Sequence, residues 1–159
     1  MVAATTRTLV TRKLVTVVGH DRQVAPDIPR RLDVRIPATH QAPAMARRAL
    51  GRLALPLPLA FDAQVAVSEL VSNSVRHAGL SPDELIRVTA DWSGARLRVH
   101  VHDGRRGGRP IGVSGSIRPA PGAESGWGLY LVDQFTSRWG TSANGYWFEL
   151  QQQPPQHDG

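Results

Sequence analysis

The chain has 159 residues, a formal net charge of +6 at pH 7 and no cysteine, so it has about the length of one ordinary domain. The lack of cysteine excludes disulfides, thiolate metal sites and cysteine nucleophiles. Residues 1–31 hold six basic and two acidic residues, which places +4 of the charge there, and the rest of the chain lacks the basic face with aromatic platforms that is typical of nucleic-acid-binding domains.

Residues 1–30 show no sustained helical or strand period, and we interpret them as a flexible basic N-terminal extension. The near-apolar stretch LVTVVG at 14–19 is far too short to cross a bilayer. We therefore expect a cytoplasmic protein without a membrane partner. The predicted folded domain spans residues 31–152, and residues 153–159 are expected to be a disordered C-terminal end.

The domain begins with a strand and two helices. RLDVRI at 31–36 alternates polar and apolar residues, which predicts a half-buried strand that Pro37 ends. A helix follows with Thr39 as its N-cap, and a second helix runs from 58 to 77 and stops before Gly79. The residues expected on the apolar sides of the two helices are Met45, Ala49, Leu50 and Leu53 in the first, and Val65, Leu70, Val71 and Val75 in the second.

Two strands come next. Residues 85–92 and 95–103 both alternate with period two, and the short link Ser93–Gly94 predicts an antiparallel hairpin. The second of these strands ends on Asp103.

The last part of the domain combines a loop, a helix and a hairpin. Residues 104–125 are crowded with Gly, Pro and Ser, and a loop of this length in a small domain is usually functional or disordered. A helix is predicted over 126–140, opened by Gly126 and Gly128. Asn144–Gly145 predicts a closing hairpin. The residues expected to face inward on the helix are Leu129, Leu131, Val132 and Phe135.

Glu69, Asn73 and His77 recur at intervals of four, which places them on one face of the second helix. Each motif also has an ordinary structural interpretation: a solvated helix face here, a turn at Asp103, and relief of crowding at the two glycines. Taken together they suggest a nucleotide site. The amide of Asn73 offers a hard ligand for a divalent cation, and Glu69 offers a base.

The other two motifs suit the same ligand. Asp103, at a strand end, can accept a hydrogen bond from the exocyclic amine of a base. A helix that begins after Gly126 and Gly128 exposes unpaired N–H groups and the positive end of its dipole, which suit phosphate oxygens.

These motifs resemble the sequence boxes of the GHKL (histidine-kinase-like) ATPase superfamily. ELVSNSVRH is similar to the N box, E-L-x-x-N-A-x-x-H; HDGRRGG is similar to the G1 box, D-x-G-x-G; and GWGLYLV is similar to the G2 box, G-x-G-L. Their order over residues 31–151 resembles the small free-standing branch that includes bacterial anti-sigma-factor serine/threonine kinases. The closing WGTSANGYWFEL resembles the final hairpin of actinobacterial members.

The resemblance implies an α+β fold, the Bergerat two-layer α/β sandwich, with a mixed, mostly antiparallel sheet and helices on one face. It also implies ATP and Mg²⁺ as cofactors. Glu69 would be the general base, Asn73 the Mg²⁺ ligand and Asp103 the residue that reads the adenine amine. The remaining nucleotide-binding positions would be Gly107, Gly126, Gly128 and Leu129, with His77 and Arg105 in supporting roles.

Two features depart from the family pattern. Ser74 replaces the usual alanine after the N-box asparagine, a small change that we expect the helix to tolerate. The segment between the G1 and G2 boxes carries Arg105, Arg106, Arg109 and Arg118, which would contact phosphates or a protein partner.

The leading functional hypothesis is a serine/threonine kinase that phosphorylates a STAS-type anti-sigma-factor antagonist and also binds a sigma factor. The length of the chain suggests that the phosphate acceptor belongs to another protein. The alternative is a non-catalytic ATP-binding regulatory adaptor that binds a protein partner. A third hypothesis, that the basic extension binds nucleic acid or an anionic membrane, rests on its charge alone. Whether the protein forms a homodimer is left open.

Overall fold

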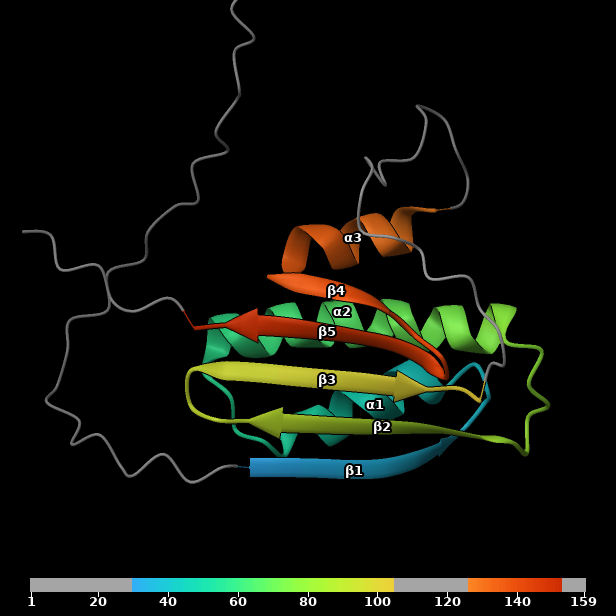
Figure 1. Cartoon of the computed structure of the whole chain (residues 1–159). Coiled ribbons are helices and arrows are strands. Elements are labelled where there is room, and N and C mark those ends of the chain that lie inside the picture. Colours follow the sequence, from blue (N-terminus) through green and yellow to red (C-terminus); the bar gives the residue numbers. More distant parts are fainter. Residues whose placement is uncertain (1–29, 105–125, 153–159) are drawn as a thin grey trace, which may run out of the picture.

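The computed structural model describes residues 30–104 and 126–152, which form five strands and three helices. The strands are β1 (Arg30–Pro37), β2 (Leu85–Trp92), β3 (Arg96–His102), β4 (Arg138–Ser142) and β5 (Gly145–Gln151), and the helices are α1 (Ala42–Gly51), α2 (Leu57–His77) and α3 (Trp127–Phe135). The strands form one sheet in the order β1-β2-β3-β5-β4, and the four pairings between described strands are antiparallel (Figure 1).

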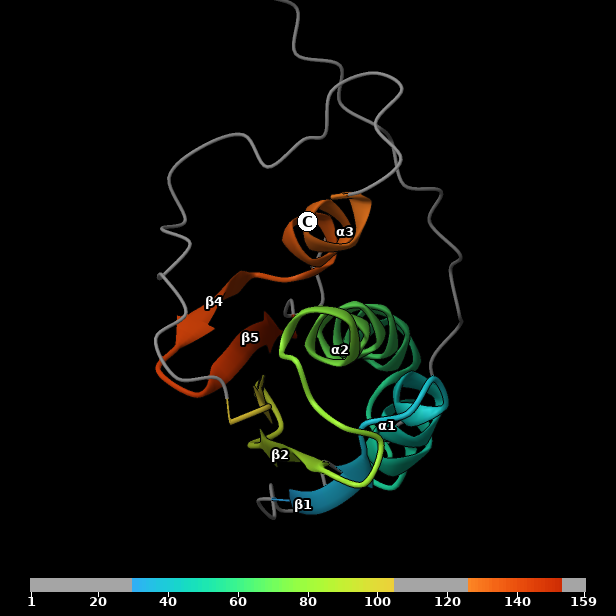
Figure 2. The same cartoon turned by 90° about the vertical axis from the view of Figure 1, so that its right-hand side faces the viewer.

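The three helices lie on one face of this sheet, so the domain has two layers (Figure 2). The α+β sandwich expected from the sequence is therefore confirmed. Alternate residues of each strand point to opposite faces of the sheet, and the buried apolar residues of the strands lie on the face toward the helices. The largest fully buried side chains of the core are Trp139, Phe148, Leu50, Leu70, Ile86, Leu97, Val67, Val71, Val88, Val99, Val101 and Val132.

The first helix, α1, begins later than the sequence predicts. The N-cap of α1 is Gln41 rather than Thr39, and no side chain caps this helix. The Thr39 carbonyl instead accepts a hydrogen bond from the backbone N–H of Ala42 at 3.0 Å. Thr39 thus contributes to the turn before the helix, through its backbone and through its hydroxyl, which accepts a hydrogen bond from the Gln41 backbone N–H at 3.3 Å.

The buried stripe of α2 also differs from the prediction. Val65 and Val75 are only half-buried. The stripe is made by residues spaced three and four apart: Leu59, Ala63, Ala66, Val67, Leu70, Val71 and Ser74.

The predicted helix over 126–140 extends five residues too far at its C-terminal end, because α3 ends at Phe135. Thr136 has an extended backbone, with φ −113° and ψ 153°, and its hydroxyl donates to the Val132 carbonyl at 2.7 Å. The residues from Arg138 onward then pair with β5 in the sheet. A hydrogen-bonded strand partner outweighs the local helical pattern here.

The predicted closing hairpin is confirmed, with its turn at Ala143–Asn144, while Gly145 opens β5. Gly145 has φ +149°, and a Cβ atom there would lie 2.0 Å from the Val101 carbonyl oxygen of β3. Glycine is needed at this position because the two backbones are so close.

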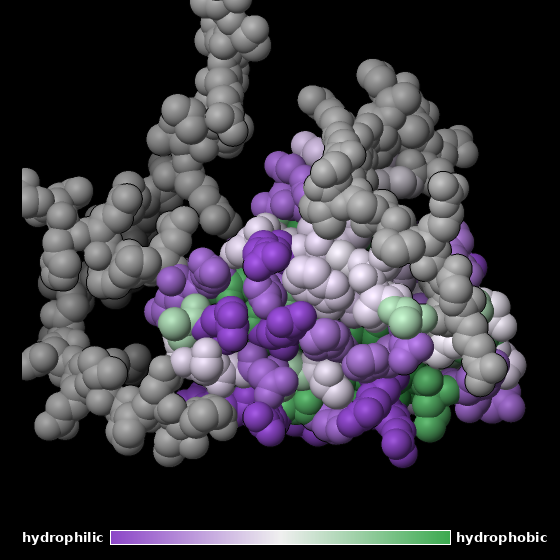
Figure 3. Space-filling model, viewed as in Figure 1, coloured by the Kyte–Doolittle hydropathy of each residue, from purple (hydrophilic) through white to green (hydrophobic). Residues whose placement is uncertain are grey.

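The face of the sheet away from the helices is mostly hydrophilic (Figure 3). Ion pairs join neighbouring strands across it, with Arg31 Nε 2.9 Å from Asp91 and Arg98 Nη1 3.2 Å from Glu149. Partial burial, with the nearby charge of Arg98, lowers the pKa of His100 from its usual value. Among the helices that the structure describes, none has the length and apolar character needed to cross a lipid bilayer.

Candidate functional site

The face of α2 that carries Glu69, Asn73 and His77 lies along the C-terminal half of this helix. Glu69 and Asn73 are half-buried, whereas His77 is exposed at the last residue of the helix. Glu69 and Asn73 are therefore partly shielded from water but still reachable. His77 lies at the solvent end of the same face, which fits the supporting role that the resemblance gives it.

Asp103 follows β3 directly and is 1% exposed. Its backbone N–H donates to the Asn144 carbonyl at 2.9 Å, which ties it to the turn between β4 and β5. Its carboxylate oxygen Oδ2 accepts a hydrogen bond from the hydroxyl of Ser74 at 2.8 Å, which ties it to α2. The carboxylate thus lies between the sheet and the helix that carries Asn73.

The N-terminus of α3 lies against Glu69. Gly126 caps this helix in the left-handed conformation with φ +94°, which glycine adopts without strain. A Cβ atom on Gly128 would lie 2.5 Å from Glu69 Oε2, closer than real Cβ contacts allow. Glycine at 128 therefore lets the start of α3 approach the carboxylate of Glu69.

The fold brings these motifs together from three distant segments of the chain. Glu69 contacts Gly128, and Ser74, the residue after Asn73, contacts Asp103. Leu129 is half-buried and packs against the hydrophobic core. The remaining predicted positions lie outside the described residues: Gly107, Arg105, Arg106, Arg109 and Arg118.

Ser74 is the site residue that the sequence reasoning missed. It is fully buried, with 0% exposure, in the apolar stripe of α2. The available signal was its spacing, because it lies four residues after Leu70 and seven after Val67 on that stripe. A polar side chain at such a position needs a hydrogen-bond partner.

In the described residues, no group of three or more His, Asp or Glu side chains is placed to hold a metal ion. Asn73 offers a single amide oxygen, a ligand type that Mg²⁺ accepts. A Mg²⁺ ion here would need further oxygen ligands from phosphate and water. This fits a metal that arrives with a nucleotide rather than one held by the protein alone.

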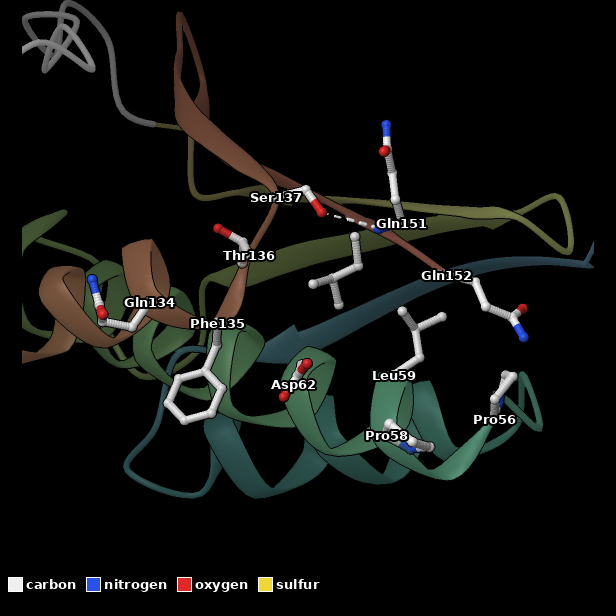
Figure 4. A pocket seen from close by; sticks show the side chains of 11 residues that line it. Pro56, Pro58, Leu59, Asp62, Gln134, Phe135, Thr136, Ser137, Gln151 and Gln152 are labelled. Carbon is white, nitrogen blue, oxygen red and sulfur yellow. Dashed lines mark hydrogen bonds between the residues drawn. The ribbon is translucent and has the colours of Figure 1, made fainter. Parts of the chain in front are cut away.

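A cavity of about 510 Å³ lies at the other end of the α2–α3 pair (Figure 4). The start of α2, the end of α3 and the end of β5 line it, with Asp62 and Phe135 among its residues. None of the site residues predicted from the sequence lines this cavity. It is therefore distinct from the site at Glu69 and Asp103.

The fold and these paired contacts define a two-layer α+β domain with a carboxylate beside a helix N-terminus and a second, buried carboxylate at a strand end. Residues 34–146 match the family model for the histidine kinase-like ATPase domain. The chain therefore belongs to this family, which indicates ATP binding and a kinase-like regulatory function. No curated protein matches the sequence.

Proposed function

We propose that the protein is an anti-sigma-factor serine/threonine kinase. It transfers the γ-phosphoryl group of ATP to a serine or threonine of a STAS-type anti-sigma-factor antagonist, and it also binds a sigma factor. Family membership supports ATP binding. The contact between Glu69 and Gly128 is the observation that supports the kinase proposal, because Glu69, the proposed base, lies beside a helix N-terminus of the kind that suits phosphates.

Each residue has a stated role in this proposal. Asp103 accepts a hydrogen bond from the adenine amine, and the N–H groups at the start of α3, after Gly126 and Gly128, bind phosphate oxygens. Asn73 contributes its amide oxygen to Mg²⁺. When bound, Mg²⁺ neutralises charge on the β- and γ-phosphates.

In the proposed reaction the acceptor hydroxyl forms a bond to the γ-phosphorus. The bond from that phosphorus to the oxygen that bridges to the β-phosphate breaks, and ADP leaves with this oxygen. Glu69 accepts the proton of the attacking hydroxyl. Its half-buried position beside Gly128 keeps the carboxylate partly shielded from water, which favours a defined orientation.

The test is Glu69→Gln, which removes the base with little change in size. We expect phosphotransfer from ATP to a STAS-type antagonist to fall at least about 100-fold, the scale of general-base catalysis, while ATP affinity stays within about threefold. Glu84→Gln is the matched control, because the carboxylate of Glu84 is exposed and accepts hydrogen bonds from the backbone N–H and the hydroxyl of Ser81, in the loop before β2.

The readouts are transfer of labelled phosphate and calorimetric titration of ATP. Wild-type transfer rates in Glu69→Gln would show that the base assignment is wrong. If wild-type protein binds ATP but phosphorylates no antagonist in a broad panel, the non-catalytic adaptor replaces the kinase.

A further inference from the structure

The Ser74 hydroxyl and the Asp103 carboxylate form a buried pair between α2 and the end of β3. Ser74 is 0% exposed and Asp103 is 1% exposed, and the two oxygens Oγ and Oδ2 are 2.8 Å apart. The acceptor is a carboxylate, so the hydroxyl is the donor. Burying a hydroxyl and a carboxylate costs free energy unless they are hydrogen-bonded. The buried pair is therefore strongly favoured in the geometry that keeps this hydrogen bond.

The contact restricts how the carboxylate is oriented. The backbone of Asp103 is fixed by β3 and by the bond from its N–H to the Asn144 carbonyl at 2.9 Å. That bond leaves rotation about the side-chain torsions undetermined. The Ser74 hydroxyl attaches the carboxylate to α2 at the oxygen Oδ2, and so it restricts the rotation of the side chain.

We propose that Ser74 is a positioning residue for base recognition, which sets the selectivity of the site for purines with an exocyclic 6-amino group. The inference rests on the proposed nucleotide site. Each carboxylate oxygen has two lone pairs, so Asp103 can accept from Ser74 and from a ligand amine at the same time. A purine with a carbonyl at position 6 would instead place its oxygen against the carboxylate, and two acceptors repel each other.

The pair also explains why a serine stands in the apolar stripe of α2. An alanine at 74 would leave the stripe continuous but would remove a donor from a buried carboxylate. The carboxylate would then turn toward other donors or admit water, and its geometry toward a ligand would be less defined.

The experiment compares two ligands in calorimetric titrations, each with Mg²⁺: ATP, and purine riboside triphosphate, which lacks the 6-amino group. In Ser74→Ala we expect the affinity for ATP to fall about 10-fold, because the Asp103 carboxylate is no longer held in the orientation that accepts the hydrogen bond from the 6-amino group. The affinity for purine riboside triphosphate should change less than about twofold, because Asp103 has no amine to bind in that ligand. Ser74→Thr, which keeps the hydroxyl, should recover most of the lost ATP affinity.

Ser72→Ala is the matched control, since it makes the same change on the same helix at a half-buried position outside the buried stripe. Ser74→Cys keeps the volume and weakens the donor, so it replaces Ser74→Ala if the alanine variant fails to fold. An equal loss of affinity for both nucleotides, or no loss for either, would overturn the positioning role. Absence of ATP binding by folded wild-type protein would overturn the nucleotide site itself, and with it this inference.

Discussion

At the residue scale, the contact between Glu69 and Gly128 links the proposed base to the proposed phosphate-binding helix end. The atom that a side chain at 128 would meet is Oε2, the far end of a flexible glutamate. A substitution there should therefore move Glu69 rather than the backbone. A substitution of Gly128 should therefore affect phosphotransfer much more than it affects the free energy of unfolding.

We predict that Gly128→Ala reduces phosphotransfer at least about 10-fold, because the new methyl group displaces the carboxylate of Glu69 from its position beside α3. The free energy of unfolding should change by no more than about 1 kcal/mol, since the glutamate can rotate away. Kinetic assays and urea titration measure the two quantities.

Gly51→Ala is the control, because a Cβ atom at Gly51 meets nothing within 4 Å at the end of α1. Full activity in Gly128→Ala would mean that the position of Glu69 beside α3 is unimportant for transfer.

The residue scale also shows why part of the site could not be predicted. The spacing of Glu69, Asn73 and His77 is a local property of one helix, so the sequence shows it directly. The bond between Ser74 and Asp103 joins residues 29 apart in the chain. Only the packing of α2 on the sheet brings them together, so Ser74 looked like a neutral replacement of alanine.

At the element scale, the hairpin of β4 and β5 does more than close the sheet. Its turn residue Asn144 holds the backbone of Asp103, and Gly145 lies close against Val101 of β3. The placement of Asp103 thus depends on a turn residue, Asn144, that lies 41 residues further along the chain.

We predict that Gly145→Ala destabilises the fold by more than about 2 kcal/mol, because the added methyl group would lie 2.0 Å from a backbone oxygen that cannot rotate away. The loss should appear as a lower denaturant midpoint in urea titration, and ATP affinity should fall as Asp103 shifts. A stability equal to that of Gly51→Ala would show that the two strands can separate slightly at little cost.

The elements that were predicted best have a strong local period. The alternation over residues 31–36 and 85–92 and the long apolar period of α2 led to elements close to those observed. The helix over 126–140 was predicted too long because Arg138–Ser142 is strand only through its pairing with β5. The prediction of Thr39 as the N-cap of the first helix was wrong for a similar reason. Its backbone belongs to the turn before α1, and residue type alone does not distinguish such a turn from a helix cap.

At the scale of the whole molecule, the helices cover one face of the sheet and the ion-paired face is left toward solvent (Figures 2 and 3). The residues of the proposed nucleotide site come from α2, from the end of β3 and from the start of α3. A ligand that contacts all three should bind only the folded state, and so it should raise the stability of the entire domain.

We predict that ATP with Mg²⁺, at about 100 times its dissociation constant, stabilises the protein by about 2.7 kcal/mol, which corresponds to a rise in Tm of roughly 5–10 °C. Chelating Mg²⁺ with EDTA should remove most of this rise. Asp103→Asn should show little or none of it, whereas Asp91→Asn, on the ion-paired face of the sheet, should keep it.

Differential scanning calorimetry measures these shifts. An equal rise in Asp103→Asn and in wild type would contradict the role of Asp103 in binding the base. A rise that persists after EDTA treatment would contradict the role of Mg²⁺.

The bond between Asp103 and Asn144 also has a consequence for the protein during its synthesis. A ribosome completes the N box and β3 well before it reaches Asn144 and β5. Until then the nascent chain lacks the carbonyl that fixes Asp103, and β3 lacks one of its two strand neighbours. The growing polypeptide should therefore acquire nucleotide affinity late, only once its final hairpin has emerged from the exit tunnel.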